Sequence, residues 1–240
     1  MTVTSSMRHC IMMGYNDVFK QKANMFSEHL RDGDMINDSY MHDAARFNNI
    51  YALELLLEKG CIDPSRQNVG GNTPLHVAAY NGHNESVEML LSNKSDPSVI
   101  NEKGELPLHR AVSRGHIDTV KLLIPVSDIN ITCKDNVSAL HTAARTGNVD
   151  MITLLMNNGA DTKLLDSKNR SVLHYGAVSG DIPTLAFLVK AGLSVTSVDN
   201  NNRKPRNTAF NNEAIQFLIQ CEQVADQQDD LISVCDSQIS

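Results

Sequence analysis

Five histidines recur along the chain at nearly constant spacing: His42, His76, His109, His141 and His174. Successive members lie about 33 residues apart, a distance in the range of repeat architectures. An imidazole can ligate a metal ion or transfer a proton near neutral pH, so a regular set of five could form a site. Copies of a helical repeat, however, stack about 10 Å apart, whereas imidazoles that share one ion lie about 4 Å apart. We therefore expect structural histidines and no metal site.

Other signals of catalysis are weak. The chain has no Gly-rich phosphate loop and no motif of the HExxH or GxSxG kind. His9 and Cys10 are neighbours in sequence, but a Cys/His pair is defined by meeting in space beside a third, orienting group. We predict no catalytic residue, no cofactor and no enzyme activity. The five cysteines lack CxxC spacing, which favours a reducing compartment; they are Cys10, Cys61, Cys133, Cys221 and Cys235.

The elements around each histidine follow one pattern, shown most clearly by the segment 73–91. Thr73 can cap a helix, and Pro74 suits the first helical turn because it has no amide to leave unpaired. Gly82, six residues after His76, can adopt the left-handed conformation that ends a helix. Apolar residues with helical spacing follow, which predicts a second helix. A fixed period of this length indicates stacked repeats rather than one globular core.

The pattern resembles the ankyrin repeat, and the resemblance covers roughly residues 35–220. It implies an all-α solenoid of stacked antiparallel helix pairs linked by hairpin-like loops. It also implies that each histidine bonds the backbone of the neighbouring loop. We expect a helical N-terminal capping segment (1–34), repeats at about 38–67, 68–100, 101–132, 133–165 and 166–198, a cap repeat (199–220) and an acidic disordered tail (221–240).

The two ends differ from the repeats. Apolar spacing predicts a helix from about Asn16 to Leu30 that would cover the first repeat. Residues 207–240 contain six acidic residues and no Lys or Arg, so residues 1–206 carry only −1 of the net charge of −7. The tail is interpreted as solubilising, as a segment that folds back on a basic face, or as a recognition signal.

In the family geometry, partners contact loop tips and the concave ends of the first helices. The residues predicted to bind a partner are Tyr80, Asn81, Lys103, Arg114, Lys134, Arg145, Lys168, Arg170 and Arg203. Counted over all loop tips and first-helix ends, there are seven basic residues and three acidic ones, Glu102, Glu105 and Asp135, which gives a surplus of +4. Arg and Lys at this density favour an acidic or phosphorylated protein segment, although an ordinary solvated surface would look the same. The acidic chain lacks a basic run with interleaved aromatics, which argues against nucleic acid.

The sequence therefore predicts a non-enzymatic protein–protein interaction module: an adaptor, scaffold or inhibitor. One alternative is a secreted bacterial effector that binds a host protein, because its acidic, Ser-containing C-terminus is similar to translocation signals of such effectors. Another is a substrate-recruiting subunit of an enzyme, since the ends are too short for a catalytic core of their own. We expect a soluble, cytoplasmic monomer, with the nucleus or a host cytosol as alternatives. No apolar run approaches membrane-spanning length.

Overall fold

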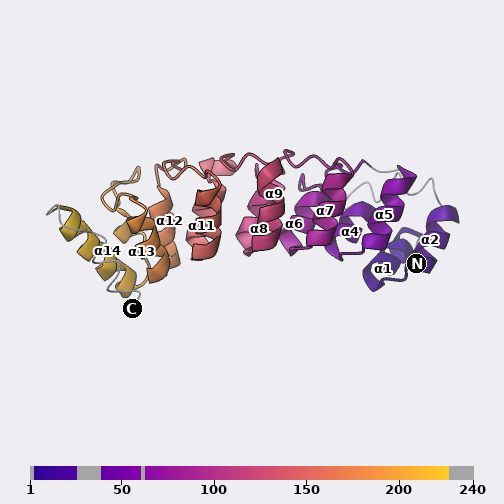
Figure 1. The fold of residues 1–240 in the computed structure, drawn as a ribbon, viewed down its shortest axis with the longest axis horizontal. Coiled ribbons are helices and arrows are strands. Elements are labelled where there is room, and N and C mark those ends of the chain that lie inside the picture. The colour runs from indigo at the N-terminus through magenta and orange to yellow at the C-terminus, as the bar shows by residue number, and fades with distance from the viewer. Residues whose placement is uncertain (1–2, 26–38, 61–62, 227–240) are drawn as a thin grey trace. The chain divides into compact units, whose positions relative to one another are not determined.

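A computed structural model of the chain describes residues 3–25, 39–60 and 63–226. Two compact units divide the chain, residues 1–128 and residues 129–240. The first unit contains α1 (Val3–Met13), α2 (Asn16–Met25), α4 (Tyr40–Arg46), α5 (Ile50–Lys59), α6 (Pro74–Asn81), α7 (Asn84–Ser92), α8 (Pro107–Arg114), α9 (Ile117–Leu123) and the 3₁₀ helix η1 (Ile124–Val126) (Figure 1). The second contains η2 (Lys134–Asn136), α10 (Ala139–Thr146), α11 (Val149–Asn157), α12 (Val172–Ser179), α13 (Ile182–Lys190), η3 (Pro205–Asn207) and α14 (Asn212–Asp226).

Each repeat is a pair of short antiparallel helices. In the first unit, α4, α6 and α8 pack against one another as first helices, and α5, α7 and α9 as second helices. In the second unit, α10 packs on α12 and α11 packs on α13. Alanine pairs such as Ala78 and Ala79 are fully buried and let the first helices approach closely, while Leu75, Val87 and Leu90 fill the core between helix layers.

The residues that begin and end a helix act as the sequence predicts. In α6 the Thr73 hydroxyl accepts a hydrogen bond from the His76 amide at 3.4 Å. Gly82 ends the helix at φ 73°, a conformation in which a Cβ would also collide with the His116 ring at 2.6 Å. Asn48 adopts φ 52° at the equivalent position of the first copy, as expected for the residue that tolerates this region next best.

Within each unit, a histidine bridge joins one copy to the next. Nδ1 of His76 accepts the Thr73 amide at 3.1 Å, so Nε2 carries the ring hydrogen and donates to the Glu105 carbonyl at 2.9 Å. The same pair of bonds is made by His42, His141 and His174, whose Nε2 atoms meet the carbonyl oxygens of Asn72, Arg170 and Arg203. These four rings have both nitrogens engaged, which confirms their structural role.

A second set of hydrogen bonds recurs from copy to copy and shapes the hairpin loops; the sequence analysis did not predict it. We call it the Asn and Asp ladder. Asn68, Asn101, Asp166 and Asp199 each use Oδ1 to accept the amides two and four residues further on. Cys133 holds this register in the remaining loop, where its thiol donates to the Val137 carbonyl at 3.1 Å. These five positions recur with the same period as the histidines, and each lies in the loop just before the histidine position of its own copy. Their spacing could therefore have revealed this recurring set of loop hydrogen bonds.

Backbone contacts then stack neighbouring loops. The Glu102 amide donates to the Gly70 carbonyl at 3.1 Å. A Cβ on Gly71, at φ 71°, would lie 2.7 Å from the same amide nitrogen, so only glycine fits there. In the second unit, the Ser167 and Asn200 amides donate to the Asp135 and Lys168 carbonyls at 2.7 and 2.9 Å.

The N-terminal segment contains one helix more than predicted. α2 begins at Asn16 as expected, but α1 precedes it, packs on α4 and buries Met7, Cys10 and Ile11. Gly14, at φ 71°, precedes Asn48 by one repeat period and ends α1 as a repeat glycine would. The helices α1 and α2 are therefore a divergent helix pair. Residues 26–30 of the helix predicted from about Asn16 to Leu30 lie outside the described residues.

The sixth copy is shortened, with the 3₁₀ turn η3 in place of a first helix. Asn207 stands where earlier copies have histidine, and its Oδ1 accepts the Lys204 amide at 3.0 Å. Thr208 then donates to the His174 carbonyl at 3.1 Å, which ties this turn to the preceding repeat.

The start predicted for the acidic tail (221–240) is too early. α14 continues to Asp226, and Cys221 and Glu222 are buried in it. Glu222 Oε2 accepts a hydrogen bond from Lys204 Nζ at 2.9 Å and forms an ion pair with Arg206 at 3.0 Å. Basic residues of the shortened copy therefore hold the start of this segment in the helix. The rest of the tail, 227–240, lies outside the described residues.

Burial of the histidines makes stability depend on pH. Burial lowers the pKa of His76 to about 4, against the opposing hydrogen bond to the Glu105 carbonyl. Burial also lowers the pKa of His141 and of His174. Below the unfolded-state pKa of 6.5 the unfolded chain binds protons that these folded rings exclude, so acid favours unfolding.

We predict that the free energy of unfolding is fully developed above pH 6.5 and falls as the pH drops toward 4. His76 alone contributes a loss on the order of 3 kcal/mol over this interval. The variant His76→Asn keeps an acceptor for the Thr73 amide, as Asn207 does for Lys204, but cannot titrate. Urea unfolding of both proteins at pH 7.5 and pH 4.5 checks this. An equal pH dependence in the variant would contradict it.

Candidate functional site

Tyr80, at the end of α6, lies against two arginines of the next first helix. The guanidinium carbons of Arg110 and Arg114 are 4.2 and 4.5 Å from the centre of its ring. The two arginines are one turn apart on α8, so their side chains reach the same face. A cation over a tyrosine ring is attracted by the ring's electrons, which positions both guanidinium groups. Arg110 also forms an ion pair with Glu105.

A shallow pocket of about 190 Å³ opens beside this ring. Its lining residues are Arg46, Asn68, Asn72, His76, Val77, Tyr80, Asn81 and Arg110. Nε of Arg110 is buried there and has no hydrogen-bond partner, and its Nη1 meets Glu105 only at 3.5 Å. A buried donor without a partner is costly, and because the Arg110 side chain is 23% exposed, its guanidinium can bind an incoming anion. The pocket can therefore hold a carboxylate or phosphate group.

Of the predicted residues in the first unit, Tyr80 and Asn81 line this pocket, and Arg114 lies over the Tyr80 ring. Lys103 is exposed on the hairpin loop and forms no ion pair with a described residue. Sequence reasoning missed Arg110, because only the last two residues of each first helix were considered. The signal was present: Arg110 precedes Arg114 by four residues and shares its helix face.

In the second unit, Arg170 is engaged within its own loop. Its guanidinium binds the fully buried Asp166 carboxylate at 2.6 Å and lies 4.8 Å from the centre of the Tyr175 ring. Tyr175 donates to the same carboxylate at 3.0 Å. Burial opposes ionisation of Asp166, but the hydrogen bonds from Arg170 outweigh it and lower the pKa of this carboxyl. Burial and the bond to Asp166 raise the pKa of Tyr175 to about 12.

Arg203 repeats this arrangement one loop later. It binds the buried Asp199 carboxylate at 2.8 Å, and this pairing outweighs burial and lowers the pKa of Asp199 to about 2. Arg170 and Arg203 thus hold loops rather than offer unpaired charge. Counting Asp166 and Asp199 with the predicted residues reduces their surplus of positive charge from +4 to +2.

The other predicted residues of the second unit are Lys134, Arg145 and Lys168. All three are exposed, and none forms an ion pair within the described part of the chain. Lys134 and Lys168 lie on hairpin loops, and Arg145 lies at the end of α10. They remain available to a ligand.

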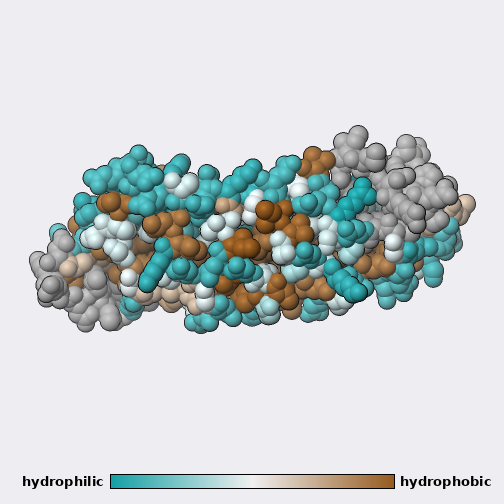
Figure 2. Space-filling model, turned by 90° about the horizontal axis from the view of Figure 1, so that it is seen from above, coloured by the Kyte–Doolittle hydropathy of each residue, from teal (hydrophilic) through white to brown (hydrophobic). Residues whose placement is uncertain are grey.

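Apolar side chains accompany the charges on the loops. Ile100 in the first unit and Leu165 and Val198 in the second occupy one register, immediately before the loop Asn or Asp, and are 52, 43 and 38% exposed. Figure 2 shows hydrophobic residues interspersed with hydrophilic ones on the face seen from above. A surface that mixes apolar contacts with Arg and Tyr has the composition of protein interfaces.

The chain is built from stacked helix pairs. Its scaffold residues recur from copy to copy, while the residues of the loops and helix ends vary. These features define a class: repeat proteins that bind other proteins through their surface. The family model described as Ankyrin repeats (3 copies) matches residues 9–101, 41–135, 93–166 and 108–199. The chain therefore belongs to the ankyrin-repeat family. Ankyrin repeats are protein–protein interaction modules, and such domains are typically not enzymes.

A solved structure is similar to the chain: the crystal structure of the ankyrin repeat domain of Bcl-3, described as a unique member of the IkappaB protein family. The TM-score is 0.74 and the sequence identity is 22%, with 89% of this chain and 97% of that chain covered. This likeness confirms the all-α fold class of ankyrin-repeat solenoids.

No helix in the described part of the chain is long and apolar enough to cross a membrane. Within the same residues, no group of three or more His, Cys, Asp or Glu side chains is placed to hold a metal ion.

We predict that Asp166→Ala lowers the free energy of unfolding by on the order of 3 kcal/mol, because it leaves Arg170, Tyr175 and two loop amides without their acceptor. Asp150→Ala, at an exposed carboxylate on α11, is the matched control and changes stability by less than about 0.5 kcal/mol. Urea unfolding measures both. Equal stabilities for the two variants would refute the assigned role of Asp166.

Proposed function

We propose that this protein is a non-enzymatic adaptor, scaffold or inhibitor that holds an acidic or phosphorylated segment of another protein. The observation that carries the proposal is the pocket beside Tyr80, where Arg110 and Arg114 stack on one ring and the buried Arg110 Nε has no partner. Preorganised guanidinium groups bind carboxylate and phosphate oxygens with charge-assisted hydrogen bonds. Family membership supports a protein as the partner.

The chemistry of the pocket favours an anionic side chain beside a planar or apolar one. The acid or phosphate would bind at Arg110 and Arg114, and its neighbours would contact Tyr80 and the exposed apolar residues of the loops. Lys103 lies on the loop that also supplies Glu105 and would attract further acidic residues of the segment. Specificity then arises from the pocket, and the association rate from the surrounding positive charge.

Replacement of Arg114 by Glu tests the charge. We predict that Arg114→Glu weakens binding of a fluorescein-labelled peptide, a phosphoserine flanked by Asp and Glu, by at least about tenfold, or 1.4 kcal/mol. The affinity of the wild-type protein should also fall as NaCl rises. Lys121→Glu makes the same charge change on α9, a second helix, and serves as the control. Fluorescence anisotropy measures both. Equal affinities for the two variants, or an affinity that ignores salt, would overturn the proposal.

The ring of Tyr80 gives a second test. No hydrogen bond of its hydroxyl is needed for the stacking, so Tyr80→Phe should retain the affinity for the same peptide within about twofold. Tyr80→Ala removes the surface that positions both arginines and should weaken binding about five- to tenfold, or roughly 1 kcal/mol. Equal peptide affinities of the Tyr80→Phe and Tyr80→Ala variants would show that the stacking does not contribute to binding.

A further inference from the structure

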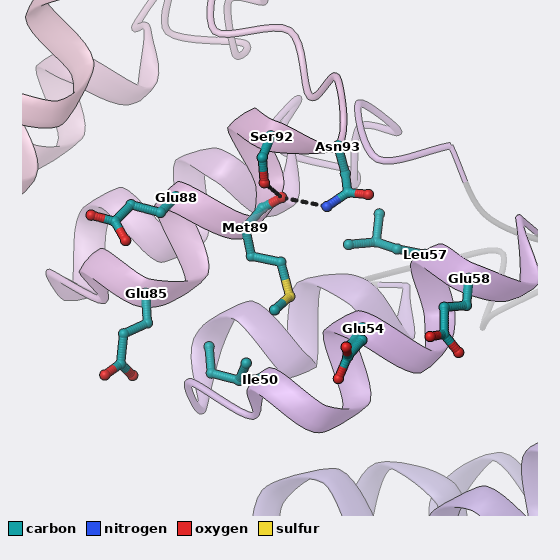
Figure 3. A pocket seen from close by; sticks show the side chains of 9 residues that line it. All are labelled: Ile50, Glu54, Leu57, Glu58, Glu85, Glu88, Met89, Ser92 and Asn93. Atoms are coloured by element: carbon teal, nitrogen blue, oxygen red, sulfur yellow. Dashed lines mark hydrogen bonds between the residues drawn. The ribbon is translucent and has the colours of Figure 1, made fainter.

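A groove lies on the other helix layer of the first unit, between the second helices α5 and α7. The two helices pack directly against each other, and the groove between them has a volume of about 640 Å³. Figure 3 shows the residues that line it: Ile50, Glu54, Leu57, Glu58, Glu85, Glu88, Met89, Ser92 and Asn93. None of these residues belongs to the pocket beside Tyr80.

The floor of the groove is apolar. Ile50 and Leu57 lie two turns apart on α5, and Met89 of α7 points between the two helices (Figure 3). All three side chains are only half-buried. Two helical turns correspond to about 10 Å, the spacing between the first and last contact residues of a helix that presents positions i, i+4 and i+7.

The rim of the groove is acidic. Glu54 and Glu58 on α5 and Glu85 and Glu88 on α7 are exposed, and no Lys or Arg lines the groove. None of the four forms an ion pair with a described residue; Glu85 accepts a neutral hydrogen bond from Asn48 at 3.0 Å. At the far end, the polar groups of Ser92 and Asn93 are satisfied by the Met89 carbonyl. Four unpaired carboxylates thus border an apolar floor.

This charge is particular to one pair of repeats rather than a property of the scaffold. Glu54 and Glu88 occupy the same register of their helices, four residues after the first helical residue. The next second helix, α9, has Lys121 at this register, and α11 in the second unit has Thr153. Stacking of repeats therefore does not require acid here, and a ligand of complementary charge would account for it.

We infer that the α5/α7 groove binds a basic amphipathic helix of a partner protein. An apolar stripe on that helix would lie on Ile50, Met89 and Leu57, and Lys or Arg on both flanks would meet the four glutamates. The groove volume is within the range of well-formed ligand sites, roughly 300–1,000 Å³. The length of α5, ten residues or about 15 Å, matches nearly three turns of a bound helix.

The two sites of the first unit would accept opposite charges. The pocket beside Tyr80 would take an acidic segment and the α5/α7 groove a basic one, from different helix layers of the same repeats. One protein could then hold two partners, or two segments of one partner, at the same time. The groove proposal does not depend on the identity of the ligand at Tyr80.

The probe is a fluorescein-labelled peptide of about 14 residues, roughly four helical turns, with Leu at i, i+4, i+7 and i+11 and Lys beside them. A peptide of the same composition with shuffled order serves as the peptide control. We expect the amphipathic peptide to bind the full chain more tightly than the shuffled one by at least about tenfold, since only it presents a continuous apolar stripe. Equal binding of the two peptides would overturn the groove as the site.

Two sets of variants locate the binding. Glu54→Gln with Glu88→Gln should weaken the amphipathic peptide at least about tenfold and flatten its dependence on NaCl. Asp150→Asn with Glu213→Gln removes the same charge from other second helices and should leave the affinity within about twofold. If both double variants weaken binding equally, the net charge of the protein rather than the groove attracts the peptide, and the proposal fails.

Met89→Gln tests the floor, because it keeps the length of the side chain and makes it polar. We expect a loss of about fivefold in peptide affinity, with an unchanged thermal unfolding midpoint showing that the fold is retained. Arg114→Glu should leave this peptide's affinity undiminished, so failure of the anion pocket and failure of the groove can be told apart. Full affinity in both Met89→Gln and the Glu54→Gln, Glu88→Gln protein would refute the inference.

Discussion

The pair of hydrogen bonds made by each bridging imidazole is the constraint on which the rest of the structure depends. The ring accepts the amide that opens its own first helix and donates to a carbonyl of the following loop, as His76 does between Thr73 and Glu105. This geometry requires a neutral ring with its hydrogen on Nε2, a helix N-cap three residues before the histidine, and a loop of fixed reach. The Asn and Asp ladder meets the last requirement, since it shapes the loop whose carbonyl the ring must find.

The fold could be predicted from sequence to the extent that each role belongs to one residue at one spacing. Caps, turn glycines and histidines are of this kind. The helix α1 was not predicted because Arg8 replaces the bridging histidine, leaving Gly14 as the main trace of the period. The ion pairs of Arg170 and Arg203 were not predicted because a charge is visible in sequence, whereas its buried partner four residues earlier is recognised only in the folded loop. The early end assigned to α14 has the same cause, since Glu222 is held by residues of another turn.

Charge in the first unit is divided between the two helix layers. First helices carry the stacked arginines beside Tyr80, and the second helices α5 and α7 carry four unpaired glutamates. Neither set takes part in the histidine bridges or in the Asn and Asp hydrogen bonds that shape the loops. In a repeat protein the scaffold is satisfied by a small number of positions, and the rest of each helix surface can change without loss of the fold. The candidate sites lie at such positions, which explains why period and composition alone did not locate Arg110 or the groove.

The residue at the bridging position of the last copy has a consequence for how the array grows. Asn207 closes its own turn through the Lys204 amide, but it is exposed and lacks the long reach of an imidazole. A copy with the bridging histidine can bond to a copy on its C-terminal side, whereas the sixth copy, with Asn207 at this position, cannot form that bond. Duplication of an internal copy would therefore lengthen the array by about one period and preserve every bridge, whereas a copy added after Asn207 would lack one.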